Sequence, residues 1–291
     1  MMALTVGLAV FVGIALGLLG GGGSILTVPL LAYVAGMDAK QAIATSLLVV
    51  GVTSAIGAVS HARAGRVQWR TGLIFGAAGM AGAYAGGLLA RFIPGTVLLI
   101  GFALMMIATA VAMLRGRKNV QATEGSHRLP VPKILAEGLL VGLVTGLVGA
   151  GGGFLVVPAL ALLGGLPMPV AVGTSLIVIA MKSFAGLGGY LSSVQIDWSL
   201  ALAVTAAAVV GALLGARLTS MVNPDSLRKA FGWFVLAMSS VILAQEIHLA
   251  VGIAGAALTA IAALMTFACS RYAHCPLRRI TGIGAARGAH A

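Results

Sequence analysis

The sequence is poor in charge, in acidic residues and in cysteine, and each shortage excludes a class of protein. Asp, Glu, Lys and Arg make up 8% of its 291 residues, whereas a soluble domain carries roughly 25%. The 6 acidic residues form no paired carboxylates and no Ser-His-Asp set is recognisable, so the chain offers no catalytic constellation. Cys269 and Cys275 are too few for a disulfide framework or a four-ligand metal site. We therefore predict no enzymatic activity, no metal and no cofactor.

Apolar sequence is what the chain has in abundance. Hydrophobic residues make up 60% of it, and long apolar runs with almost no charge are typical of helical membrane proteins. The net charge of +12 would also suit a nucleic-acid-binding protein, but basic residues of membrane proteins collect in cytoplasmic loops. We expect an all-α polytopic membrane protein whose surroundings are a lipid bilayer, with no nucleic acid as partner.

Most apolar segments have the length of one membrane crossing, about 20 residues. Two segments, 3–36 and 134–166, are longer and are interrupted by glycines, where a helix should break. The remaining segments predict transmembrane helices at 42–61, 71–91, 95–114, 170–191, 199–220, 230–245 and 248–269.

The two broken segments carry the same motif, 129 positions apart. Gly17–Ser24 is followed by Pro29 and by Ala44-Thr45-Ser46-Leu47, and Gly146–Gly153 is followed by Pro158 and by Gly173-Thr174-Ser175-Leu176. A duplicated half with a glycine-interrupted segment in matching positions points to a transporter with a site at the membrane midplane. The same offset pairs Ser54 with Ser183, Gly57 with Gly186, Trp69 with Trp198, Gly82 with Gly211 and Gly86 with Gly215.

The basic residues indicate how each broken segment runs. If each one is a hairpin that leaves on its entry side, 15 basic residues face one side and Lys40 and Arg91 face the other. If each one crosses once, the same residues divide 8 against 9. The positive-inside rule favours the hairpins. Three crossings and a hairpin per half then give the halves inverted topology, with a cytoplasmic C-terminus; an external C-terminal reporter would contradict this.

These observations predict two inverted repeats, each a glycine-broken hairpin segment plus three transmembrane helices, with one extra C-terminal transmembrane helix. The extra helix has no counterpart in the first half. The predicted layout is a first repeat at 1–114, a basic cytoplasmic linker at 115–133, a second repeat at 134–245, the appended helix at 246–269 and a basic cytoplasmic tail at 270–291.

The glycine runs are the first candidates for a binding site. Glycine allows a ligand to approach the backbone closely, and a helix that restarts after a break presents unpaired N–H groups and a positive dipole end. Such a start can hold an anion; the alternative is that the glycines only form a tight turn. The candidate residues are Gly22, Gly23, Ser24, Gly151, Gly152 and Gly153.

Hydroxyls and one lysine are the second group of candidates. The pairs Thr45-Ser46 and Thr174-Ser175 follow the broken segments; they contact a ligand, or bond only to carbonyls of their own helix. Lys182 lies well inside an apolar crossing, where a cation costs at least about 2.5 kcal/mol. We expect it to contact an anion; the alternative is a lysine that snorkels or bonds a backbone carbonyl. The glycine pairs 82/86 and 211/215 predict close helix packing.

The glycine runs, the following prolines and the stretches Ala44–Leu47 and Gly173–Leu176 resemble the TauE/SafE sulfite exporter family over about residues 5–245. The resemblance implies a carrier of the bacterial inner membrane for small sulfur-containing anions such as sulfite, thiosulfate or sulfonates. On this basis we expect a secondary transporter, an exporter, that works by alternating access. The rival hypotheses are an anion channel and a membrane partner subunit that delivers a sulfur compound to a cytoplasmic enzyme. The oligomeric state is left open, a homo-oligomer included.

Overall fold

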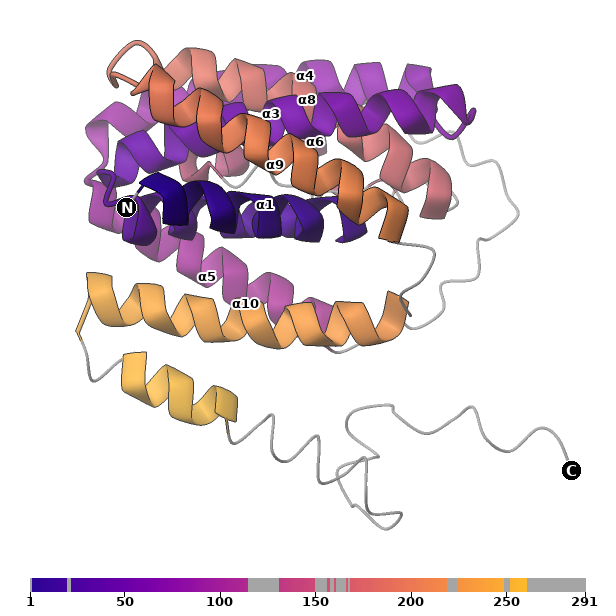
Figure 1. Cartoon of the computed structure of the whole chain (residues 1–291). Helices are drawn as coiled ribbons and strands as arrows, with labels where there is room; N and C mark the ends of the chain where they lie inside the picture. Colours follow the sequence, from indigo (N-terminus) through magenta and orange to yellow (C-terminus); the bar gives the residue numbers. More distant parts are fainter. Residues whose placement is uncertain are drawn as a thin grey trace, which may run out of the picture. The chain divides into compact units, whose positions relative to one another are not determined.

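The computed structural model describes residues 2–19, 22–114, 131–149, 156–157, 160, 166, 168–218, 224–248 and 252–260. Within these ranges all regular structure is helical, which confirms the predicted all-α class (Figure 1). Its principal helices are α1 (Met2–Leu19), α3 (Ala39–Arg63), α4 (Trp69–Leu89), α5 (Gly95–Leu114), α6 (Val131–Val148), α8 (Met168–Tyr190), α9 (Trp198–Leu218) and α10 (Pro224–Glu246).

Four of the described helical stretches are long and apolar enough to cross a membrane. They are Ala39–Arg63, Trp69–Phe92, Val170–Tyr190 and Trp198–Leu218, and each begins and ends within a few residues of a predicted segment. The second of them includes the short 3-10 helix η3 (Ala90–Phe92), which continues α4. The other apolar helical stretches are shorter: Leu4–Leu18, Ser24–Val34, Gly95–Val111, Ile134–Val148 and Gly232–Glu246.

Two helices begin earlier than the apolar runs predicted. Helix α6 begins at Val131 rather than at 134, and α10 begins at Pro224 rather than at 230. Proline is accepted in the first helical turn because that turn has no partner for its N–H groups. Both helices therefore open with a proline-containing turn outside the apolar run, which a search for apolar length does not detect.

Helix α1 ends at Leu19, where the glycine run was predicted to break it. The chain continues as the 3-10 helix η1 (Gly22–Leu26), the single turn α2 (Thr27–Pro29) and the π-helix η2 (Leu30–Val34). Both η1 and η2 contact α1. A helix continuing straight past the glycines would carry η2 well beyond the end of α1 at 1.5 Å per residue, so this segment folds back along α1.

The chain divides into two compact units. The first comprises Met1–Phe102 and Val120–Pro224, and the second comprises Ala103–Asn119 and Asp225–Ala291. In the second unit Gly232 of α10 packs against Leu114 of α5, and Gly252 packs back against Ala244. Of the predicted appended helix, residues 252–260 are helical; the tail from 270 and the linker up to residue 130 lie outside the described residues.

In the first unit, the contact between α4 and α6 recurs between α9 and α1, the helices that correspond to them in the other half of the sequence. Helix α4 packs on α6 and α1 packs on α9 (Figure 1). A methyl group on Gly82 of α4 would overlap the carbonyl oxygen of Leu139 in α6, and one on Gly211 of α9 would overlap that of Val10 in α1. Adding 129 to Gly82 gives Gly211, and subtracting 129 from Leu139 gives Val10, so the same contact occurs twice. The correspondence also relates Gly86 and Leu143 to Gly215 and Ile14, Gly142 and Gly79 to Gly13 and Ala208, and Gly146 and Ala83 to Gly17 and Ala212.

These contacts confirm that the paired glycines serve helix packing. Without a side chain at the contact, two helix backbones can approach closely. In lipid the hydrophobic effect does not drive helices together, so dispersion contacts and weak polar contacts between them hold the pair. Helices α3 and α8, which are also equivalent under the offset, pack on each other as well. Leu47 lies against the position of Gly186 and Leu176 against that of Gly57, so α3 and α8 run antiparallel.

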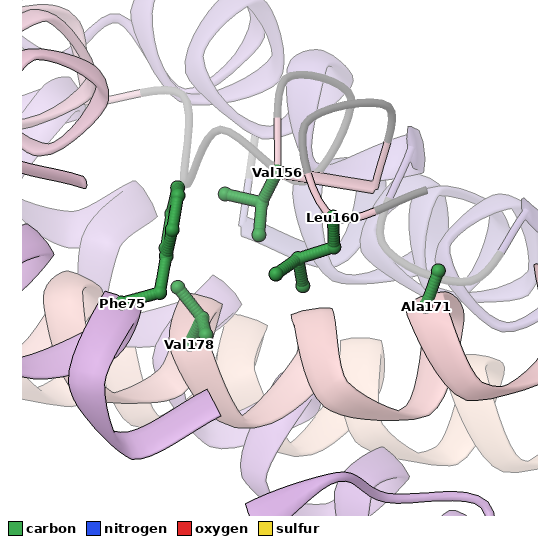
Figure 2. Close-up of a cluster of buried hydrophobic side chains, with 5 residues drawn as sticks. All are labelled: Phe75, Val156, Leu160, Ala171 and Val178. Atoms are coloured by element: carbon green, nitrogen blue, oxygen red, sulfur yellow. The ribbon is translucent and has the colours of Figure 1, made fainter. Parts of the chain in front are cut away.

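A cluster of buried apolar side chains holds the second broken segment in place. Val156 and Leu160 follow the glycine run and meet Phe75 of α4 and Ala171 and Val178 of α8 (Figure 2). All five are nearly inaccessible to solvent, with exposed fractions of at most 3%. Two further side chains, from α6, pack against the same cluster: Ile134 and Val141. The residues after the second glycine run therefore lie near α6, as those after the first lie near α1.

Candidate functional site

Lys182 is buried in the middle of α8 with 1% of its surface exposed. Its Nζ donates a hydrogen bond to Thr145 Oγ1 of α6 at 3.1 Å. Among the described residues the ammonium makes no other hydrogen bond, and it forms no ion pair with a carboxylate. An ammonium has three N–H donors, so Thr145 satisfies only part of its capacity. A buried cation in this condition is expected to face an anion or a polar cavity.

Thr145 connects Lys182 to the point where α6 breaks. Its Oγ1 donates to the carbonyl oxygen of Val141 at 2.7 Å, so towards Lys182 it acts as an acceptor. One turn later the N–H of Gly149 bonds to the carbonyl oxygen of Thr145 at 2.9 Å. Gly149 has φ +72°, the left-handed conformation with which helices commonly end and which glycine adopts without strain. The lysine is thus fixed to the last turn before the second glycine run.

Tyr190 makes a second polar contact from α8 to the end of α6. Its hydroxyl donates to the carbonyl oxygen of Leu147 at 2.5 Å, and the side chain is fully buried. The last carbonyls of a helix lack partners within the helix, and this hydroxyl satisfies one of them. Sequence reasoning missed Tyr190 because its partner lies in a segment 43 positions away.

The first half reaches the same break through Ser46. Its Oγ donates a hydrogen bond to the carbonyl oxygen of Gly149 at 2.6 Å and lies 3.0 Å from that of Ile43 in its own helix. Gly149 also packs so tightly on Ile43 that a methyl group there would overlap the isoleucine side chain. The start of α3 therefore contacts the end of α6, and a residue of the predicted site bridges the two halves.

Two buried threonine hydroxyls, one in α3 and one in α2, have no hydrogen-bond partner among the described residues. Thr45 is one of the predicted site residues, and Thr27 lies in α2, which packs on α3; both are buried. A buried hydroxyl without a partner costs about 1–3 kcal/mol, so both are candidates for contact with a polar ligand. Sequence reasoning missed Thr27, although its place three residues after Ser24 and next to the glycine run was a usable signal.

The second Thr-Ser pair has structural partners. Thr174 Oγ1 accepts a hydrogen bond from the backbone N–H of Gln68 at 3.0 Å, which fastens the α3–α4 connection to α8. Ser175 Oγ donates to the carbonyl oxygen of Val172 at 2.8 Å, within its own helix. Of the two interpretations open for these hydroxyls, their contacts favour the structural one. The two halves therefore use equivalent hydroxyls differently.

The structure places only part of the predicted glycine site. Gly22 and Gly23 form the start of η1, followed by the buried Ser24. Gly151, Gly152 and Gly153 lie outside the described residues. Among the residues that the structure describes, no group of three or more His, Cys, Asp or Glu side chains gathers in a way that could hold a metal ion.

Comparison with known proteins places the chain among membrane transporters. The model of the family described as sulfite exporter TauE/SafE matches residues 5–242. A probable membrane transporter protein of Xylella fastidiosa (strain 9a5c) is 35% identical over 244 residues, which are 82% of this chain and 93% of that protein. A similarly described protein of Methanocaldococcus jannaschii is 29% identical over 242 residues, or 76% of this chain and 89% of its own. No solved structure matches the chain.

Proposed function

Because this chain belongs to the TauE/SafE sulfite exporter family, a family of membrane transporters, we propose that it is a secondary transporter that exports a small sulfur-containing oxyanion. The anion is sulfite, thiosulfate or a sulfonate. The observation that carries this proposal is Lys182, a buried cation whose Nζ is tied to Thr145 rather than to a carboxylate. An anionic substrate would supply the missing counter-charge.

The proposed binding site lies where α3, α6 and α8 meet. Lys182 supplies charge, Thr45 and Thr27 supply hydroxyls without other described partners, and Ser46 fixes the end of α6 by its bond to Gly149. An oxyanion accepts several hydrogen bonds, and bonds from charged donors are about twice as strong as neutral ones. The glycine-run amides are proposed to complete the site, since the ends of broken helices bind anions in transporters.

We propose further that the two halves are inverted repeats that alternate in access. The exchange of contacts between α1–α9 and α4–α6 supports a two-fold relation between the halves. Equivalent helices of inverted repeats run in opposite directions through the membrane, and the equivalent helices α3 and α8 are antiparallel. The same proposal places the protein in the inner membrane of a bacterial cell, with its basic C-terminus in the cytoplasm.

The proposed driving force is the membrane potential together with the substrate gradient. Neither glycine run is followed by the Lys-Ser/Thr that a nucleotide-binding loop requires. Export of an anion is favoured by an inside-negative potential, worth about 2.3 kcal/mol per charge per 100 mV. Export down this potential is favourable without a coupled ion, and proton or ion coupling is the alternative driving force.

Flux measurements in proteoliposomes test the proposal. Uptake of labelled sulfite, thiosulfate and sulfoacetate is measured against external concentration, with protein-free liposomes as control. We expect saturable uptake of at least one anion, accelerated by excess unlabelled anion on the opposite side. Flux that rises linearly with concentration would indicate a channel, and no flux of any of the three from folded protein would remove the proposed substrate class.

A further inference from the structure

Two serine hydroxyls on α3 and α8 remain unused by the site described above. Ser54 has 2% of its surface exposed and Ser183 has 0%. Neither Oγ has a hydrogen-bond partner within the described part of the chain. The two residues occupy equivalent positions of the two halves, since 54 and 183 differ by the repeat offset. Two equivalent buried donors without partners among the described residues suggest contact with a polar ligand.

The lack of a partner is unusual for hydroxyls in these helices. A serine or threonine inside a helix commonly donates to the carbonyl three or four residues earlier. Thr53, the neighbour of Ser54, does so to Val49 at 2.7 Å, and Thr145 does so to Val141 at 2.7 Å. Ser54 and Ser183 make no such bond, which leaves their hydroxyls available to another acceptor.

Both serines lie on the faces by which α3 and α8 touch. Ser54 is three residues after Gly51, which packs on Phe184, and three before Gly57, which packs on Leu176. Ser183 follows Leu176 by seven residues, about two helical turns, and so shares its face. The serines therefore lie between contacts that join the two helices, with Phe184 and Leu176 packed against the glycines on either side of Ser54.

We propose that Ser54 and Ser183 form a pair of hydroxyl donors that contacts the transported oxyanion between α3 and α8. This inference rests on the proposed function and adds two binding residues to it. Ser183 is the next residue after Lys182 in α8, and the ammonium of Lys182 is a buried positive charge carried by the same helix. That charge favours an anion over a cation as the ligand of the hydroxyls.

The test compares Ser54→Ala, Ser183→Ala and the double variant with wild type in proteoliposomes loaded for sulfite uptake. A hydrogen bond to a charged group is worth about 1.5–3 kcal/mol, so we expect each substitution to raise the KM for sulfite roughly tenfold or more. The matched control is Thr53→Val, which removes a hydroxyl already bonded inside α3; its KM should change less than twofold. Ser54→Cys and Ser183→Cys keep the shape of the side chain with a slightly larger, weakly donating atom, and they should raise the KM as well.

Thermal unfolding separates ligand contact from a structural role. Removal of an unpaired buried hydroxyl should leave the unliganded Tm unchanged or higher, while sulfite should raise the Tm of the double variant less than that of wild type. An unchanged sulfite KM in the double variant, with normal wild-type flux, would overturn this inference alone. Absent wild-type flux would overturn the proposed function as well.

Discussion

Lys182 Nζ lies 3.1 Å from Thr145 Oγ1, and this bond joins the buried charge of α8 to the last turn of α6. Four residues after Thr145 the chain reaches Gly149, where α6 has ended and the second glycine run begins. A movement of the α6 break would therefore move the acceptor of the lysine. In a transporter that alternates between two states, a movement of the helix break would thus change the hydrogen bond of Lys182.

Loss of the acceptor should disturb both stability and transport. Thr145→Val leaves the ammonium with one acceptor fewer, so we expect a loss of about 1–3 kcal/mol in the free energy of unfolding and a raised KM for sulfite. Thr145→Ser restores the oxygen and should restore both values. Thr109→Val, which removes a hydroxyl bonded to its own helix at Met105, is the control. Equal KM values in all four proteins would show that Thr145 does not position the lysine.

The helix contacts predict which glycine of α1 is replaceable. Gly13 packs against the carbonyl oxygen of Ala208, whereas Gly7 has open space beside it. Gly13→Ala should lower the free energy of unfolding by about 1–3 kcal/mol, because overpacking forces the helices apart. Gly7→Ala should be neutral or stabilising by up to about 1 kcal/mol, because alanine favours helix. Denaturation in detergent measures both, and equal effects would contradict the close contact of α1 and α9.

The repeat adds a stricter version of this test. Gly142 is the equivalent of Gly13 in the second half, and it packs against Gly79 of α4. Gly142→Ala should therefore destabilise the protein about as much as Gly13→Ala does. A large difference between the two would argue against the two-fold relation of the halves.

Gly149 and Gly36 provide a matched pair for the helix break. Both have positive φ, +72° and +70°, which costs an L-residue about 1–2 kcal/mol. Only Gly149 also contacts Ile43; Gly36 has open space around it. We expect Gly36→Ala to show the backbone cost alone, and Gly149→Ala to be less stable still and defective in transport. Thermal unfolding and sulfite flux are measured for both variants. Equally mild effects of the two substitutions would show that the break after α6 plays no part in transport.

Sequence reasoning located most of the fold because membrane helices are marked by apolar length and their breaks by glycine. It predicted the ends of α5 and the break after Leu19 in full, and it identified the packing glycines Gly82, Gly86, Gly211 and Gly215 but not Gly13 and Gly142. It missed the starts of α6 and α10, because a first turn rich in polar residues and proline has no apolar signature. The contact of η2 with α1 fits the hairpin that the distribution of basic residues predicted for the first broken segment, which apolar length alone did not distinguish from a single crossing.

The site was less predictable than the fold. Lys182 stood out because a lone cation in an apolar helix is rare, but its bond to Thr145 joins residues 37 positions apart. Thr174 showed the same pattern as Thr45, yet it bonds to the backbone of Gln68 while Thr45 has no partner among the described residues. Whether a hydroxyl bonds to the protein or is available to a ligand depends on the residues packed around it. A repeated sequence motif does not specify those neighbours.

The basic tail should be dispensable for flux. Residues 271–291 lie outside both predicted repeats, so a chain ending at residue 270 should transport sulfite with unchanged KM and maximal rate. Expression of the two chains is compared by quantitative blotting of purified membranes. A loss of flux at equal expression would favour the hypothesis of a partner subunit that acts through its tail.

We expect the buried charge of Lys182 to bind the transported anion. The most direct measurement is counterflow of labelled sulfite in proteoliposomes containing wild type, Lys182→Met or Lys229→Met. Lys229 is an exposed lysine of α10 and serves as the control for charge removal. We expect saturable counterflow in wild type and in Lys229→Met, and none in folded Lys182→Met. Counterflow in Lys182→Met with an unchanged KM would show that the lysine does not bind the anion.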